Sequence, residues 1–351
     1  MHIFDYRFLR ESEVDSDLLK RLLNIERIRG KSSKMLDDND SVAYALENRA
    51  ILMSVVGSNA IEGIVTSEER AVGLISGDTR PRGHDENEIL GYRDALKLIH
   101  MDHGNMRIDK ETILGLYRTM MQYSVTEDVG FKTRDNVVIV RDPGGHITGQ
   151  RPTVPASGVE DAIEQLVLAY VEVRDDGNVQ SLLLIPCFIM DFLMIHPFPD
   201  GNGRMSRLLT TLLLYQEGYD IGRYISMESK INASRDDYYD AIADSQDGWF
   251  DNGNDYAPFI SYFLGQLFLC YRDLNRFTGE QIGRSRKSNA LEEYLRICPF
   301  HVSKKDLCSM FPEVSAVTVS RVLSRMVKDG ELEMVGAGRA TRYMSVKNKL
   351  N

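Results

Sequence analysis

The sequence predicts a mainly α-helical protein with two short β-hairpins. Most of the chain repeats its apolar side chains with the 3.6-residue period of an amphipathic helix. Two segments depart from that period. A β-branched run at 137–140 precedes an Asp-Pro-Gly-Gly turn, and glycines at 336 and 338 mark the turn of a second hairpin. The segment 181–195 is apolar almost all round, which predicts a helix buried at the centre of the fold.

The helical pattern recurs along the chain up to about residue 278. Asp109 is placed to cap one of these helices, and a Gly- and Pro-containing break at 77–85 separates two others. Pro186 lies inside the apolar segment, so we expect that helix to begin or kink there. The expected helices are 15–29, 41–56, 86–100, 108–121, 158–174, 181–195, 205–216, 234–245 and 258–277.

We expect three units: an N-terminal helical region at 1–100, a core at 101–278, and a small domain at 285–351. A polar, basic, Gly-containing segment at 279–288 predicts the linker before the last unit. That unit holds expected helices at 290–297, 303–310 and 315–329 and a hairpin at 331–344. Its two later helices have helix-turn-helix spacing, and the whole resembles a winged helix.

Composition is ordinary for a globular protein, with 43% hydrophobic and 27% charged residues among 351. The four cysteines form no Cys-x-x-Cys pair, which argues against a zinc ribbon or a disulfide framework. No secretory signal opens the chain, and the longest apolar run, 182–190, is far shorter than the roughly 18–20 residues of a membrane span. We therefore expect a cytoplasmic protein without a membrane partner.

Charge is distributed unevenly. The formal net charge is −10, yet residues 282–351 carry 13 basic and 7 acidic side chains, a balance of +6, which leaves −16 for the rest. An acidic body repels nucleic acid, whereas a small basic domain tolerates it. DNA binding by the last domain and a role for it in protein contacts both stay open.

One segment, His196-Pro-Phe-Pro-Asp-Gly-Asn-Gly-Arg-Met-Ser-Arg207, gathers the groups that phosphate chemistry needs. The Gly-Asn-Gly turn feeds a new helix whose N-terminal N–H groups favour an anion. Arg204 and Arg207 lie three residues apart on one helix face, where both can reach phosphate oxygens. Asp200 offers a carboxylate for Mg²⁺, and His196 is the group whose pKa suits proton abstraction.

This segment resembles the Fic motif, His-x-Phe-x-Asp/Glu-Gly-Asn-Gly-Arg-x-x-Arg, at every defined position. The resemblance implies the mainly helical Fic fold and transfer of AMP from ATP to a protein hydroxyl. It implies that His196 deprotonates the hydroxyl and that Asp200 binds Mg²⁺. It also implies that Arg207 engages the γ-phosphate, while the other phosphates are held by Gly201, Asn202, Gly203 and Arg204.

Two looser matches extend the resemblance. The hairpin within 131–155 lies where Fic proteins carry a flap that clamps a target segment by strand addition, and Val138 and Ile139 are the expected docking residues. Lys132 stands at the flap entry where many relatives carry Arg. Downstream, Asn232 and Tyr239 resemble the segment that closes the adenine site, although the tyrosine is equally compatible with a place in the core.

Upstream, Ser58-Asn-Ala-Ile-Glu62-Gly fits the family's inhibitory-helix pattern, Ser/Thr-x-x-x-Glu-Gly/Asn. The resemblance implies that the Glu62 carboxylate pairs with Arg207 and so misplaces ATP. A misplacement near 1 Å can cost roughly 100-fold in rate.

The sequence therefore predicts an autoinhibited, ATP- and Mg²⁺-dependent protein adenylyltransferase acting on a Ser, Thr or Tyr hydroxyl. Its expected partners are an unidentified target protein, DNA through the winged helix, and a second copy in a homodimer. The competing hypothesis is a DNA-binding regulator whose Fic core senses nucleotide, and a third is transfer of another phosphate-linked group. In some relatives the inhibitory glutamate also helps to remove AMP, so reversal stays open.

Overall fold

A computed structural model describes most of the chain. The described residues are 2–11, 16–37, 40–124, 129–141, 146–279, 291–292, 294–296, 298, 301–311, 314–336, 338 and 341–346. Within them the fold is mainly helical, as predicted, with two separate two-stranded antiparallel sheets. The expected linker at 279–288 and parts of the expected helix at 290–297 lie outside the described residues.

Helices carry the N-terminal region and the core. Before the hairpin come the 3₁₀ helix η1 (Arg7–Arg10) and the helices α1 (Ser16–Asp37), α2 (Asp40–Ile61), α3 (Glu68–Ser76), α4 (His84–Asp102) and α5 (Lys110–Met121). After the hairpin come η2 (Ala156–Gly158), α6 (Val159–Asp176), α7 (Ser181–Ile195), α8 (Asn202–Gln216), η3 (Asp220–Arg223), α9 (Met227–Ala233), α10 (Arg235–Gln246), η4 (Trp249–Asp251) and α11 (Ala257–Gly279).

Several helix ends follow directly from the sequence. Asp109 caps α5, and its side chain accepts a 2.7 Å bond from the Thr112 N–H, as predicted. Helix α7 does not begin at Pro186: it starts at Ser181 and runs through the proline, whose ring is buried among apolar neighbours. Proline removes one N–H, and burial of the other apolar side chains of the helix outweighs that loss. Helices α3 and α9, nine and seven residues long, are additions to the predicted set.

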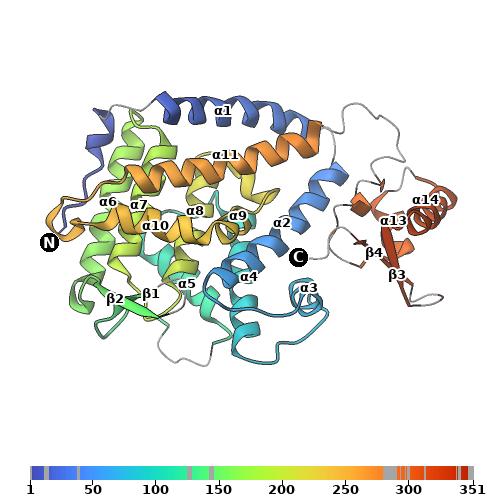
Figure 1. The fold of residues 1–351 in the computed structure, drawn as a ribbon, viewed down its shortest axis with the longest axis horizontal. Coiled ribbons are helices and arrows are strands. Elements are labelled where there is room, and N and C mark those ends of the chain that lie inside the picture. Colours follow the sequence, from blue (N-terminus) through green and yellow to red (C-terminus); the bar gives the residue numbers. More distant parts are fainter. Residues whose placement is uncertain are drawn as a thin grey trace.

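The apolar α7 lies at the centre of the core and is held there by a buried carboxylate. Asp191 is fully buried and accepts bonds from the Tyr6 hydroxyl at 2.7 Å, the Trp249 indole N–H at 2.7 Å and the Tyr256 hydroxyl at 2.8 Å. A buried carboxylate is tolerated only with such partners. These bonds tie the first residues of the chain and the segment between α10 and α11 to the helix that ends directly before His196 (Figure 1).

The hairpin consists of β1 (Val137–Arg141) and β2 (Ile147–Pro152), paired antiparallel with Val138 opposite Arg151 and Ile139 opposite Gln150. It lies beside the core at the lower left of Figure 1, near the end of α5. Lys132 anchors its approach to the core, because the Lys132 N–H donates to the Pro197 carbonyl at 2.8 Å.

The C-terminal unit contains α13 (Lys304–Met310), α14 (Ala316–Lys328), β3 (Leu332–Val335) and β4 (Arg342–Ser345). Ser303 and Ser315 cap the two helices, and Gly330 follows α14 with a φ of +71°. In Figure 1 this unit stands at one side of the helical body, past the end of α11. Its identification as a winged helix stays a prediction.

Candidate active site

The site forms where α7 ends and α8 begins. His196 follows the last residue of α7 with a φ of 50°, one of two non-glycine residues with a positive φ in the described part of the chain. Gly201, with a φ of +78°, precedes the first turn of α8. The two left-handed residues reverse the chain, so the imidazole and the N-terminus of α8 belong to one short loop.

The loop between them is packed and hydrogen-bonded. Phe198 is fully buried, and its ring stacks on Tyr117 with centroids 3.7 Å apart. Asn202 bonds both sides of the Phe198 backbone: its Oδ1 accepts from the N–H at 2.9 Å, and its Nδ2 donates to the carbonyl at 2.8 Å. This packing fixes the loop before any ligand arrives.

His196 is held in its neutral form. Burial, and then the nearby positive charge of Lys132, lower the pKa of His196 to about 4, although Asp200 and Glu62 act in the opposite direction. Its Nδ1 lies 3.1 Å from Asn202 Nδ2 and 3.2 Å from Asn136 Nδ2. Asn136 could not be recognised from the sequence, since nothing in the chain near residue 136 signals contact with a histidine sixty residues later.

Arg204 is a buried cation with carboxylate partners. Its side chain is 1% exposed, and its Nη1 donates to Glu88 Oε2 at 2.6 Å. Its Nη2 donates to Asp200 Oδ2 at 3.2 Å. Glu88 comes from α4, outside the motif, and could not be recognised from the sequence either. It fixes the Arg204 guanidinium at the start of α8 before a phosphate is bound.

Arg207, one turn further along α8, is hydrogen-bonded by residues at the end of α2. Its Nε donates to Ser58 Oγ at 2.8 Å, and its Nη2 donates to the Ser58 carbonyl at 3.0 Å and to Glu62 Oε1 at 2.7 Å. Ser58 and Arg207 are buried, whereas the Glu62 side chain is 32% exposed. The structure thus brings together the three residues Ser58, Glu62 and Arg207 that the sequence paired.

Glu62 also lies against the backbone of the Gly-Asn-Gly turn. A Cβ added at Gly203 would collide with Glu62 Oε1 and would come within 3.3 Å of Arg207 Nη1. The glycine therefore permits the carboxylate to reach this point. The Glu62 carboxylate occupies space at the N-terminus of α8, which favours negative charge.

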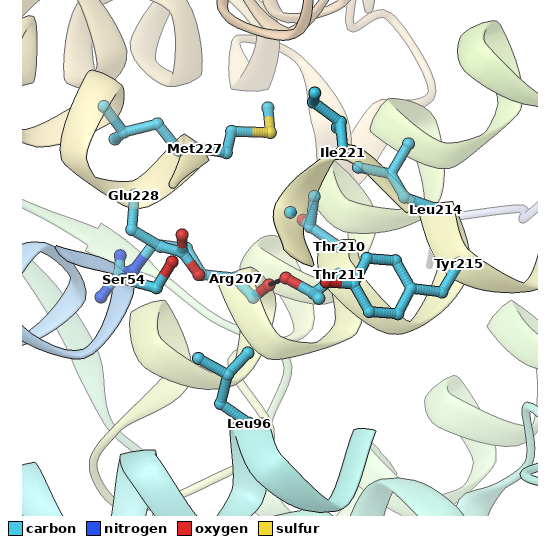
Figure 2. A pocket seen from close by; sticks show the side chains of 12 residues that line it. Ser54, Leu96, Arg207, Thr210, Thr211, Leu214, Tyr215, Ile221, Met227 and Glu228 are labelled. Atoms are coloured by element: carbon cyan, nitrogen blue, oxygen red, sulfur yellow. Dashed lines mark hydrogen bonds between the residues drawn. The ribbon is translucent and has the colours of Figure 1, made fainter. Parts of the chain in front are cut away.

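Behind Arg207 is a cavity of about 20 Å³, lined by residues of α2, α4, α8, η3 and α9. Figure 2 shows Thr210, Thr211 and Glu228 beside the arginine around this space. The volume suffices for about one water molecule and is far below that of a nucleotide.

The tyrosines of α10 and Asn232 of α9, which follow the motif in the chain, differ in their exposure to solvent. Tyr238 is buried, and burial raises the pKa of its hydroxyl, while the positive charge of Arg207 lowers this pKa and the negative charge of Glu62 raises it. Tyr239 is 41% exposed, with its ring centroid 5.3 Å from that of Tyr238 and 5.7 Å from the Arg235 guanidinium carbon. Asn232 is an exposed residue of α9.

The flap residues are accessible. Val138 is 36% and Ile139 is 39% exposed, and β1 pairs with β2 alone within the described residues. A strand that pairs on one side presents N–H and C=O groups to an incoming segment.

The residues present fit a Mg²⁺ ion that is shared with phosphates. Asp200 is 71% exposed and has an oxygen, Oδ1, beyond the one that contacts Arg204. Among the described residues no group of three or more His, Cys, Asp or Glu side chains could hold a metal by itself. Mg²⁺ commonly takes one or two carboxylates and completes its shell with water and substrate phosphates, which is compatible with this single donor.

In the described part of the chain, no helix combines the length and the apolar character that crossing a bilayer requires.

Comparison with known proteins gives a consistent result. The model of the Fic/DOC family matches residues 107–214, which include the whole segment from His196 to Arg207. Two curated relatives are each named protein adenylyltransferase Fic. The protein from Drosophila virilis is 28% identical over 204 residues, which is 57% of this chain and 40% of the relative, and the one from Aedes aegypti is 25% identical over 248 residues, 69% and 45%. The chain thus spans less than half the length of these relatives.

Solved structures show the same fold. A Fic family protein from Desulfovibrio desulfuricans G20 superposes with a TM-score of 0.64 at 22% identity, covering 95% of this chain and 97% of that one. A Fic domain containing signaling protein from Bacteroides thetaiotaomicron gives 0.62 at 20% identity, covering 75% and 99%. The family model, whose match includes the motif between α7 and α8, thus identifies a Fic/DOC family domain at residues 107–214 of the chain.

Proposed function

We propose that the protein is a protein adenylyltransferase that moves AMP from ATP to a Ser, Thr or Tyr hydroxyl of a target protein. The observation that carries the proposal is the convergence of a neutral imidazole, two arginines and a helix N-terminus within one packed loop. The names of the curated relatives point to the same chemistry.

The proposed reaction follows from these positions. The target hydroxyl oxygen forms a bond to the α-phosphorus of ATP, the bond from that phosphorus to the bridging oxygen breaks, and pyrophosphate leaves. The hydroxyl proton passes to His196. Arg204, Arg207 and the N–H groups at Gly201, Asn202 and Gly203 hold the phosphates, so catalysis comes mainly from positioning and charge stabilisation. A Mg²⁺ ion held by Asp200 would neutralise phosphate charge.

We propose further that the resting enzyme is autoinhibited. Arg207 is occupied by Glu62 and Ser58, and the Glu62 carboxylate lies against Gly203, where phosphate oxygens would otherwise contact the start of α8. Two anions do not share one such site without a large repulsion. ATP then binds with its γ-phosphate away from Arg207 and its α-phosphate out of line for attack.

The exposed edge of β1 supports a docking role for the hairpin. A target segment that adds as a strand beside Val138 and Ile139 would be held by backbone hydrogen bonds, near the loop that carries His196. Tyr239 and Asn232 are the proposed contacts on the nucleotide's base side.

The competing function, DNA binding by the C-terminal unit, has weaker support. Several of its basic side chains already have acidic partners: Arg325 pairs with Glu292 at 2.5 Å, and Arg342 pairs with Asp306 at 3.2 Å. Fewer free cations mean fewer phosphate contacts. A salt-dependent shift of duplex DNA that persists in a His196→Ala variant would favour this regulator instead.

The test compares two labels of the donor. The Glu62→Gly variant is incubated with a cell lysate and Mg²⁺ and either α-labelled or γ-labelled ATP, with Glu62→Gly/His196→Ala as the matched control. Adenylyl transfer predicts labelled protein from the α-label alone and none in the double variant. Labelling from the γ-label would indicate phosphoryl transfer. No labelling from either donor, with ATP still bound, would refute ATP as the donor of a transferred group.

A further inference from the structure

His196 presents one ring nitrogen to two side-chain amides. Its Nδ1 lies 3.1 Å from Asn202 Nδ2 and 3.2 Å from Asn136 Nδ2. One amide belongs to the first turn of α8, and the other directly precedes β1 of the hairpin. Which ring nitrogen carries the proton then depends on which end of each amide faces Nδ1.

The orientation of the Asn202 amide is fixed by two backbone groups, one of which can only donate a hydrogen bond and one of which can only accept. Its Oδ1 accepts from the Phe198 N–H, which can only donate, and its Nδ2 donates to the Phe198 carbonyl, which can only accept. Turning the amide over would place donor against donor and acceptor against acceptor. The NH₂ group of Asn202 therefore faces His196.

The orientation of Asn136 is fixed equally well. Its Oδ1 lies 2.7 Å from the ammonium of Lys132, which has no acceptor capacity, and 2.8 Å from the Thr153 hydroxyl. Its Nδ2 donates to the Phe198 carbonyl at 3.1 Å. Lys132 is 4% exposed and also donates to Thr153 Oγ1 at 2.8 Å, so the ammonium is held in place.

Neutral imidazole has one donor and one acceptor nitrogen. Because both amides offer N–H groups to Nδ1, that nitrogen must accept, and the single ring proton belongs on Nε2. We propose that Asn136 is a positioning residue that, together with Asn202, holds His196 in the Nε2–H tautomer. The importance of this tautomer for the reaction rests on the proposed transferase function. Nε2 of the resting enzyme is then a donor and cannot accept the proton of a target hydroxyl.

To accept that proton, Nε2 must be unprotonated. In the neutral ring the single proton must then be on Nδ1. Nδ1–H would then face two N–H groups, so an amide must turn and offer its oxygen instead. Asn136 is the amide next to the hairpin, and its oxygen is bound by Lys132 and Thr153. A target segment that adds to β1 and shifts this contact would remove one of the two N–H groups that oppose a proton on Nδ1, so docking would favour release of the base.

The tautomer is measured directly by long-range proton–nitrogen NMR of protein labelled with ¹⁵N-histidine at neutral pH. The His196→Gln variant assigns the signal by its loss. We expect Nδ1 to be unprotonated and Nε2 to carry the proton. A proton on Nδ1, or on both nitrogens, would overturn the inference. No nucleotide or target is needed, so the outcome is independent of whether the protein transfers AMP.

The role of Asn136 is tested by Asn136→Asp, which keeps the shape and replaces the NH₂ group by an acceptor. We expect the His196 proton to move to Nδ1, and in a Glu62→Gly background we expect severalfold faster single-turnover labelling. Asn178→Asp, in the loop before α7, is the control and should change neither. An unmoved tautomer in a variant of wild-type melting temperature refutes the role of Asn136.

The two proposals fail differently. In Asn136→Asp the His196 proton could move to Nδ1 while labelling becomes slower than in Glu62→Gly alone. That result would refute release of the base and would leave the transferase proposal intact. Absence of labelling in every Glu62→Gly protein would refute the transferase, and the NMR result would still decide the tautomer.

Discussion

Glu62 Oε1 lies 2.7 Å from Nη2 of Arg207, although the two residues are 145 positions apart. The contact joins the end of α2 to the first turns of α8 and closes on a guanidinium that Ser58 also binds. A carboxylate with partial exposure thus holds a buried cation of the proposed phosphate site. This relationship is the basis of the proposed inhibition.

Ser58→Ala should weaken the contact between α2 and Arg207 without removing the Glu62 carboxylate. Arg207 Nε would lose its buried acceptor, which costs about 1–3 kcal/mol of stability. We expect a lower melting temperature and labelling between those of wild type and Glu62→Gly. Ser54→Ala, one turn earlier on α2 and also buried, is the control. Equal labelling by the two serine variants would contradict a role for Ser58 in the inhibitory contact.

Glu88→Ala should destabilise the fold and weaken ATP binding. The change leaves the buried Arg204 without its shortest carboxylate contact, and breaking a buried ion pair by removing one partner costs about 3–5 kcal/mol. Glu160→Ala removes an exposed carboxylate near Lys110 and should cost less than about 1 kcal/mol. Denaturant unfolding and calorimetric titration with ATP measure both effects. Similar losses in the two variants would show that Glu88 does not support Arg204.

The pKa of His196 predicts a stability change on the acid side of neutrality. The pKa is about 4 in the folded protein against an ordinary value of 6.5, so the unfolded chain binds more protons between these values. Stability contributed by the neutral ring is therefore present above about pH 6.5 and is lost as the pH falls toward 4. Burial lowers the pKa of His100 in the same direction.

The measurement is urea unfolding of wild type and His196→Asn at pH 7 and pH 4.5. We expect the variant to lose less stability than wild type over this interval, by about 3 kcal/mol at most. We also expect label transfer by Glu62→Gly to be level from pH 6 to pH 8, because the ring is already neutral. A wild-type stability loss no larger than that of the variant would contradict the assigned pKa.

Removing the metal should abolish transfer and spare the fold. Asp200 is exposed, so Asp200→Asn should change the melting temperature little, while labelling by Glu62→Gly/Asp200→Asn should fall strongly at fixed Mg²⁺. EDTA should abolish labelling by the single variant, and excess Mg²⁺ should restore it. Undiminished labelling in EDTA would exclude a required divalent ion.

The sequence predicted the parts of the fold that local patterns encode. The apolar 181–195 segment is the buried central helix, Asp109 is a helix cap, and the β-branched run at 137–140 lies in β1. Short helices α3 and α9 were missed because nine and seven residues give too little periodicity to recognise. The helix does not begin at Pro186, because burial of the apolar helix outweighs one lost hydrogen bond, and a kink there stays a prediction.

The candidate site shows the same division. His196, Arg204 and Arg207 follow from the motif, since one loop and one helix turn place them together. Glu88 and Asn136 carry no local signal: they reach the site from α4 and from the foot of the hairpin through tertiary packing. A buried acid facing a motif arginine, or an amide facing a histidine, becomes recognisable only when the elements are placed in space.

The most direct test of the inhibitory contact measures binding and transfer side by side. Wild type and Glu62→Gly are titrated with ATP in the presence of Mg²⁺ and then assayed for label transfer from α-labelled ATP under the same conditions. We expect both proteins to bind ATP and the variant to transfer label on the order of 100-fold faster. Equal transfer by the two proteins, with ATP bound by both, would contradict inhibition by Glu62.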